Sequence, residues 1–325
     1  MNILIRNLQR KKFFKVLIIF LLITIIGCVY QSIMVNYESE KYKNPGQLIK
    51  VYNHKMHIYG EGKGTPTVVF TVGSGTPSAY TDYYFIQKSI SKITRTISYD
   101  RLGYGWSDKT SIDRKIDQVV DELHTLLEKS GEKPPYVLVG NSLSSLEVIR
   151  FAQVFPQEVV GVVLIDGGNP TYYATLSEKA TLVPMYILQL AGKSGLVRTL
   201  GNVGILLPLT NEKKRAKLLP EGLSKVDKAL FYKSSGEKNN ISEVKTINEN
   251  AKKVIDGGTI GSIPLIILTS EKSAEDMIWK KTQMQLKDWS ANSKHEIVKN
   301  STHYIHWDKP NVVYERIKEL IESLK

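Results

Sequence analysis

Ser142 is the residue whose sequence context most strongly indicates chemistry. The apolar segment 136–140 before it predicts a buried strand, and the apolar spacing within 146–152 after it predicts a helix. Gly140 and Ser144 are small enough to let that strand and helix pass closely on either side of a sharply turned serine. The pattern predicts a nucleophile elbow, which would present the Ser142 hydroxyl for attack on a carbonyl carbon.

A serine hydroxyl is a weak nucleophile at neutral pH, so this chemistry also needs a histidine base and a carboxylate that orients the histidine. The chain has six histidines. Two of them, His303 and His306, lie in the loop 300–310, directly after the predicted last strand 296–298.

Two further segments resemble one known family. A glycine-punctuated loop, Val72-Gly73-Ser74-Gly75-Thr76-Pro77, follows a predicted strand, and the run Asp100-Arg101-Leu102-Gly103-Tyr104-Gly105-Trp106-Ser107 follows the next. Together with the elbow and the loop 300–310, they resemble the α/β-hydrolases in motif and order over about residues 48–325. The resemblance implies the serine esterase, lipase and peptidase-like branch. It also implies an α/β fold with an eight-stranded, mostly parallel sheet, helices on both faces, and a helical cap inserted after strand six.

The resemblance assigns His303 as the catalytic base and favours a packing role for His306. The family's acid usually follows strand seven, but Ser273 occupies the matching position here. Asp166, at the end of strand six, can reach the same histidine in a variation of the fold and is the expected acid. The alternatives, if the loop after strand seven is long, are Glu271, Glu275 and Asp276.

Acyl transfer also requires donors for the developing oxyanion. The elbow supplies the backbone N–H of Leu143. The position of Ser74 in the glycine loop matches the residue that supplies the second N–H in the family.

The chain divides into several expected regions. Residues 48–168 and 256–325 are expected to form the hydrolase core. More than ninety residues separate strands six and seven, which is far beyond an ordinary connection. A cap or lid is expected at 169–255, and the polar segment 36–47 is expected to be a linker.

The N-terminus predicts a membrane anchor. Residues 16–35 are uncharged and long enough to span a bilayer, and the basic segment 1–15 should stay in the cytoplasm, which puts the hydrolase domain outside. The first alanine is Ala79, so no Ala-x-Ala cleavage site follows the apolar run. A relaxed lipobox ending at Cys28 leaves a lipoprotein as the alternative, although apolar residues continue past it and favour a retained helix.

Composition excludes some functions. The formal charge of +12 falls to +7 without the five basic residues of segment 1–15, and the remainder is scattered. No nucleic-acid motif accompanies this charge, and the single cysteine allows no internal disulfide. No metal or cofactor is expected, and the sequence gives no indication of an oligomeric state.

The leading hypothesis is a membrane-anchored serine hydrolase that cleaves a carboxylic ester or related acyl bond of a small molecule. Peptidase and thioesterase chemistry use the same machinery. The alternative is a catalytically silent scaffold that binds a ligand or an envelope partner.

Overall fold

The computed structural model describes residues 2–205, 215 and 217–324 and contains one eight-stranded sheet in the order β1-β2-β4-β3-β5-β6-β7-β8. The strands are β1 (Gln47–Val51), β2 (His54–Glu61), β3 (Thr67–Thr71), β4 (Thr96–Tyr99), β5 (Tyr136–Asn141), β6 (Val159–Ile165), β7 (Leu265–Ser270) and β8 (Ser293–Val298). β2 pairs with β1 and β4 in antiparallel fashion, and all other pairs are parallel. The expected eight-stranded, mostly parallel sheet is confirmed.

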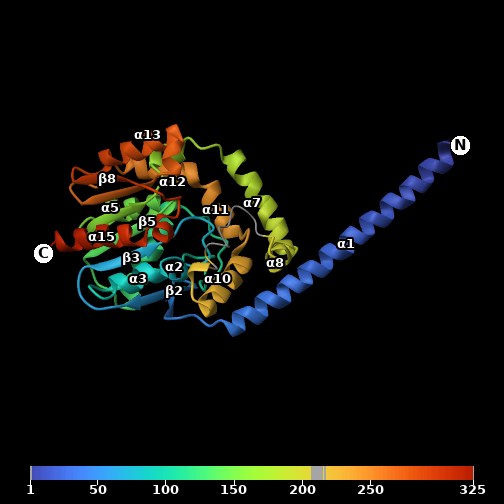
Figure 1. Ribbon diagram of the computed structural model, residues 1–325, viewed down its shortest axis with the longest axis horizontal. Helices are drawn as coiled ribbons and strands as arrows, with labels where there is room; N and C mark the ends of the chain where they lie inside the picture. The colour runs from blue at the N-terminus through green and yellow to red at the C-terminus, as the bar shows by residue number, and fades with distance from the viewer. Residues whose placement is uncertain (1, 206–214, 216, 325) are drawn as a thin grey trace.

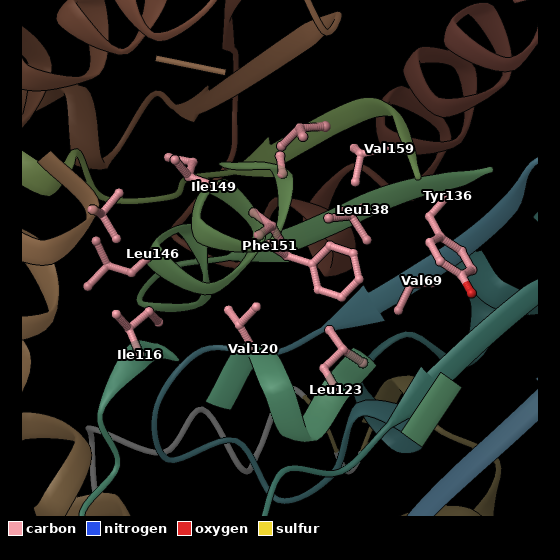
Figure 2. Close-up of a cluster of buried hydrophobic side chains, with 14 of the residues drawn as sticks. Val69, Ile116, Val120, Leu123, Tyr136, Leu138, Leu146, Ile149, Phe151 and Val159 are labelled. Carbon is pink, nitrogen blue, oxygen red and sulfur yellow. The ribbon is translucent and has the colours of Figure 1, made fainter. Parts of the chain in front are cut away.

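The central strands are buried on both faces, as their continuous apolar sequences require. In β5, Leu138 packs into one core cluster, while Val137 and Val139 pack into the cluster on the opposite face. Figure 2 shows the first of these clusters, where α4 and α5 side chains lie over Val69 and Leu138 of the sheet.

Helices cover both faces of the sheet. The helices of the core are α2 (Ala79–Asp82), α3 (Tyr84–Ile90), α4 (Ile116–Ser130), α5 (Ser144–Val154), α13 (Met277–Gln285), α14 (Ile305–Asp308) and α15 (Pro310–Glu322), with 3-10 turns η2 (Ser273–Glu275) and η3 (Leu286–Trp289). α4 and α5 supply the cluster of Figure 2, and α3 and α15 supply the opposite one. Gly131, at φ 80°, ends α4 in the left-handed conformation that glycine adopts without strain.

The segment between β6 and β7 is helical. It contains α6 (Pro170–Ala174), α7 (Glu178–Lys193), α8 (Leu196–Asn202), α10 (Glu221–Ser234), α11 (Lys238–Lys245) and α12 (Ile247–Asp256). Figure 1 shows α7, α8, α10 and α11 gathered at one end of the sheet. α12 differs from them, because its apolar residues Ile247, Ala251 and Val254 belong to the main core cluster. By its packing, α12 is a core helix inside the range expected to be cap.

The N-terminal helix α1 (Asn2–Lys41) is longer than expected. Residues 36–41, predicted as part of a linker, continue the helix, so only a short segment connects Lys41 to β1. Figure 1 shows α1 projecting away from the domain, with its C-terminal part beside α8 and α10. By length and composition, α1 can cross a membrane.

The parallel strands bring six loops to one edge of the sheet. The loops after β3, β4, β5, β6, β7 and β8 all leave from carboxyl ends, and parallel α/β sheets place their ligand sites at this edge. These loops carry every residue that the sequence assigns to catalysis.

Candidate active site

Ser142 occupies the sharp turn between β5 and α5. Its φ is 54°, a left-handed conformation that is strained for a residue with a side chain. Ser144 begins α5 in ordinary helical geometry and donates its hydroxyl to the Asn141 carbonyl at 2.8 Å. The elbow therefore accommodates Ser144 without distortion, because the left-handed residue is Ser142 itself.

His303 and Asp166 are in contact. The distance between His303 Nδ1 and Asp166 Oδ2 is 2.8 Å. Asp166 is fully buried, whereas the His303 side chain is 33 % exposed. A carboxylate at Nδ1 fixes the proton on that nitrogen and leaves Nε2 free to accept one, which is the tautomer a general base needs.

Several donors hold the Asp166 carboxylate in place. Oδ2 accepts the hydroxyls of Ser270 at 3.0 Å and Ser273 at 2.5 Å, and Oδ1 accepts the Trp279 indole N–H at 3.2 Å. Ser273 stands where the family's acid is usual, so this position now supplies a hydrogen bond to the acid on the neighbouring strand. The sequence offered no signal for the roles of Ser270 and Trp279.

The three alternative acids make other contacts. Glu271 accepts the backbone N–H of Asn300 at 2.8 Å, Glu275 is exposed and paired with Lys272, and Asp276 caps the first turn of α13. In the part of the chain that the structure describes, the carboxylate in contact with His303 is that of Asp166.

Two polar residues at the turn between β5 and α5 make hydrogen bonds to the segments that follow β6 and β8. Asn141 donates its amide to the Ile165 carbonyl at 2.7 Å and to the His303 carbonyl at 3.4 Å. Ser145 donates its hydroxyl to the Gly168 carbonyl at 2.7 Å. Both residues fasten the turn that carries Ser142 to the loops that carry Asp166 and His303.

The glycine loop lies directly against Ser142. A Cβ added to Gly73 would come within 2.9 Å of the Ser142 Cβ, so a larger residue would displace either the loop or the nucleophile. The N–H groups of Ser74, next in this loop, and Leu143, next after the nucleophile, are the two predicted oxyanion donors.

A buried network supports the glycine loop from the cap. The Tyr104 hydroxyl accepts the Gly75 N–H at 3.4 Å and donates to Glu243 of α11 at 2.5 Å. Arg101 donates to the Val72 carbonyl at 2.7 Å and also pairs with Glu243 at 2.9 Å. Burial raises the pKa of Tyr104, so its hydroxyl stays protonated. Glu243 thus connects the cap to the loop that carries Ser74.

Glu147 of α5 completes this network. It lies 3.0 Å from Arg101, whose single charge is shared with Glu243. Burial raises the pKa of Glu147 well above its ordinary value, and the charge of Glu243 acts in the same direction. Of the two carboxyls that contact Arg101, Glu147 is thus the one whose pKa burial raises, and Glu243 supplies the second ion pair.

Tyr173 of α6 contacts the nucleophile and was not anticipated from the sequence. Burial raises its pKa, while hydrogen bonds with the Ser142 side chain and the Gly168 backbone lower it. The net effect is a rise, so the phenol stays protonated beside the Ser142 hydroxyl.

His306 lies in a separate cluster. Its Nε2 is 2.8 Å from Asp82 Oδ2, and both side chains are fully buried. Arg215 also pairs with Asp82, at 2.6 Å. Burial alone would raise the pKa of Asp82, but the charges of His306 and Arg215 outweigh it, so this pKa lies below its usual value. The cluster joins α2 to α14.

The described residues contain no group of three or more His, Cys, Asp or Glu side chains arranged to hold a metal ion.

Known proteins resemble this chain over most of its length. The sequence model of the alpha/beta hydrolase fold family matches residues 66–310. The uncharacterized protein YbdG of Bacillus subtilis is 35 % identical over 155 residues, which is 48 % of each chain, so the match spans about half of that relative. The uncharacterized protein YqjL of the same organism is 25 % identical over 82 % of this chain and 87 % of its own.

Solved structures share the fold at low sequence identity. An enol-lactonase from Burkholderia xenovorans superposes with a TM-score of 0.65 at 14 % identity, covering 85 % of this chain and 100 % of its own. An esterase from Thermogutta terrifontis superposes with a TM-score of 0.63 at 16 % identity, covering 85 % and 97 %. From the family match and the sheet topology, we conclude that the chain belongs to the α/β-hydrolase fold family.

Proposed function

We propose that this protein is a membrane-anchored serine hydrolase that cleaves a carboxylic ester or a related acyl bond. The observation that carries the proposal is the arrangement at the carboxyl edge of the sheet, where a left-handed Ser142 lies in the elbow and His303 contacts a buried Asp166. The esterase and lactonase among the structural neighbours are compatible with this reaction class.

The reaction follows from these roles. Ser142 Oγ attacks the acyl carbon while His303 Nε2 takes the hydroxyl proton, and Asp166 stabilises the imidazolium through Nδ1. The N–H groups of Leu143 and Ser74 bind the oxyanion, each worth about 3–4 kcal/mol of transition-state stabilisation. Collapse expels the alcohol, which receives the proton from His303. Water, activated by the same histidine, then releases the acid from Ser142.

The test is labelling of the full-length protein in detergent with a fluorophosphonate probe. Ser142→Ala and His303→Ala should abolish labelling, whereas the matched variants Ser111→Ala and His54→Ala should retain it. Ser111 is exposed and His54 begins β2, so neither belongs to the site. A folded wild-type protein that does not label would refute the proposal and favour a ligand-binding scaffold.

We also propose that α1 is a retained anchor that leaves the hydrolase domain outside the cytoplasm. Its first fifteen residues are basic without an acidic residue, which favours a cytoplasmic N-terminus. α1 continues without a break past Cys28 to Lys41, which favours retention over lipoprotein cleavage. Mass spectrometry of the protein from membranes tests this, because a lipoprotein would begin at Cys28 with a lipid attached.

A further inference from the structure

The C-terminal part of α1 is bound to the cap. Arg198 of α8 is buried and makes two hydrogen bonds to the Glu38 carboxylate, at 2.6 and 2.8 Å. Its Nε donates to the Gln31 side chain at 2.7 Å, and Gln31 donates to the Tyr232 carbonyl of α10 at 2.8 Å. These contacts fix α8 and α10 relative to α1.

The contact continues into the apolar part of α1. A Cβ added to Gly27 would lie 2.1 Å from the Ser194 carbonyl oxygen, and one added to Gly195 would lie 2.8 Å from the Gly27 carbonyl oxygen. Such close backbone approach requires glycine at both positions. Gly27 precedes Val35, the end of the apolar segment, by eight residues, which is about 12 Å along a helix. If α1 spans a bilayer, the end of α7 must therefore lie below the membrane surface.

α7 presents an apolar face to the outside. Val183, Tyr186, Ile187 and Leu190 recur at helical spacing, and all four are exposed; Ile187 is 63 % and Leu190 71 % exposed. Between Lys179 and Lys193, both exposed, the helix carries no charge. An uncharged stretch of this length is typical of a core helix or of an interfacial one, and the exposure excludes the core.

The opposite face of α7 is already occupied. Leu188 and Ala191 pack against the small cap cluster that contains Phe231 and Tyr232 of α10. Gln189 donates to the Gly236 carbonyl at 2.8 Å. The orientation of α7 is thus fixed by the cap, and its exposed apolar face remains available to a partner.

We propose that this partner is the lipid bilayer, so that α7 lies in the membrane surface beside α1. The inference rests on the proposed anchoring role of α1. Figure 1 shows α7 running across the direction of α1, with the sheet on the far side of the cap. A helix in this position buries its apolar face about 5–10 Å into the head-group and acyl boundary. Lys179, at the end of α7 away from the Gly27 contact, would meet anionic head groups.

This placement also specifies a substrate class. Tyr173, which is hydrogen-bonded to Ser142, precedes the start of α7 by five residues. The segment that leads from the nucleophile therefore ends at the membrane surface. The substrate is accordingly an acyl ester whose apolar chain is dissolved in the bilayer.

Lipid quenching of a site-specific fluorophore tests the position of α7. Each variant carries Cys28→Ser and one new cysteine. The test positions are Ile187 and Leu190 of α7. A cysteine at Ile23 of α1 serves as the membrane reference, and one at Ile93 serves as the control. Ile93 is an exposed apolar residue before β4, at the sheet edge opposite the cap. Each full-length variant is labelled with an environment-sensitive fluorophore and reconstituted in vesicles that contain lipids with nitroxide groups on their acyl chains.

We expect quenching at the two α7 positions and at Ile23, but not at Ile93. At the α7 positions, nitroxides near the head group should quench more strongly than nitroxides near the end of the acyl chain. Quenching at Ile23 alone would overturn the placement of α7 and leave the anchor intact. Lack of quenching at Ile23 would refute the anchor and, with it, the inference. The measurement requires no enzymatic activity, so it is independent of the Ser142 chemistry.

A second measurement tests the substrate class. The double variant Ile187→Asp/Leu190→Asp should lose tenfold or more activity toward a long-chain nitrophenyl ester in vesicles and keep its activity toward nitrophenyl acetate in solution. Equal loss on both esters, or loss on neither, would overturn the substrate assignment.

Discussion

His303 and His306 lie three residues apart in the chain, and each contacts an aspartate. The two histidine–aspartate pairs differ in their burial and in the other partners of the aspartate. The His303–Asp166 and His306–Asp82 contacts are both 2.8 Å. The first pair has a partly exposed imidazole and an acid held by neutral donors. The second is completely buried, and its acid also binds Arg215. The geometry of the pair alone therefore does not distinguish a catalytic histidine from a structural one.

The surroundings make the difference. Hydroxyl and indole donors orient Asp166 without neutralising it, so its charge remains available to a developing imidazolium. Asp82 shares its charge with a permanent cation, and the remaining nitrogen of His306, Nδ1, is buried with no hydrogen-bond partner. The His306 side chain has no exposed surface. We therefore expect the first pair to control activity and the second to control stability.

The largest difference in kcat between variants of the two pairs should come from Asp166→Asn. An amide cannot hold His303 in the required tautomer, and the corresponding change in serine proteases costs about 10⁴-fold in kcat. The measurement is turnover of a soluble nitrophenyl ester, with circular dichroism to verify folding. The matched variant is Asp82→Asn, whose kcat per folded molecule should stay within about twofold of wild type, since Asp82 lies outside the site. Similar losses of kcat in both variants would remove the distinction between the pairs.

The effects of the same two variants on stability should be in the opposite order, with Asp82→Asn the more destabilised. Asp82→Asn removes the carboxylate charge that offsets the buried charges of Arg215 and His306. This loss should lower the free energy of unfolding by about 3 kcal/mol. Thermal unfolding should show a fall in Tm of roughly 5–10 °C. Asp166→Asn should change Tm by less, because its hydroxyl partners can also bond to an amide oxygen. A larger fall for Asp166→Asn would contradict the structural role of the second pair.

The sequence predicted the fold, and it predicted that Ser142 lies at the turn after β5 and His303 in the loop after β8, because both depend on local patterns. The strand and helix around Ser142 follow from apolar spacing, and the loops follow from chain order. The supports of Asp166 could not be predicted in the same way. Trp279 lies 113 positions from Asp166 in the chain, and nothing in its local sequence specifies the contact.

Two local features within the predicted regions also differ from the sequence pattern for physical reasons. The polar residues 36–41, predicted as part of a linker, continue α1, and Glu38 is paired with Arg198 of the cap. The range predicted as cap from the long segment between strands six and seven includes most of α12, yet the apolar stripe of α12 packs on the core. Tertiary contacts of this kind leave no signal in the local pattern.

A smaller effect is expected from Ser273→Ala, which sharpens the account of the first pair. Removing the hydroxyl takes a hydrogen bond from the carboxylate oxygen that contacts His303, so kcat should fall about tenfold, or 1.4 kcal/mol. The measurement is turnover of a soluble nitrophenyl ester. Ser111→Ala should leave kcat unchanged. A Ser273→Ala kcat equal to that of wild type would mean that Ser273 merely fills space.

The smallest effect concerns the second pair and its dependence on pH. The pKa of Asp82 is lowered in the folded protein, whereas in the unfolded chain it should lie near its ordinary value of about 3.9. Between these two pKa values the unfolded state binds more protons, so this stabilisation is complete at neutral pH and is lost as pH falls below about 4 toward the folded pKa. Urea unfolding of wild type and Asp82→Asn at pH 6 and pH 3 should show the gap in unfolding free energy narrowing by about 1 kcal/mol. A constant gap would mean that Asp82 stabilises α2 and α14 through packing rather than through its charge, and the contrast between the two pairs would then rest on burial alone.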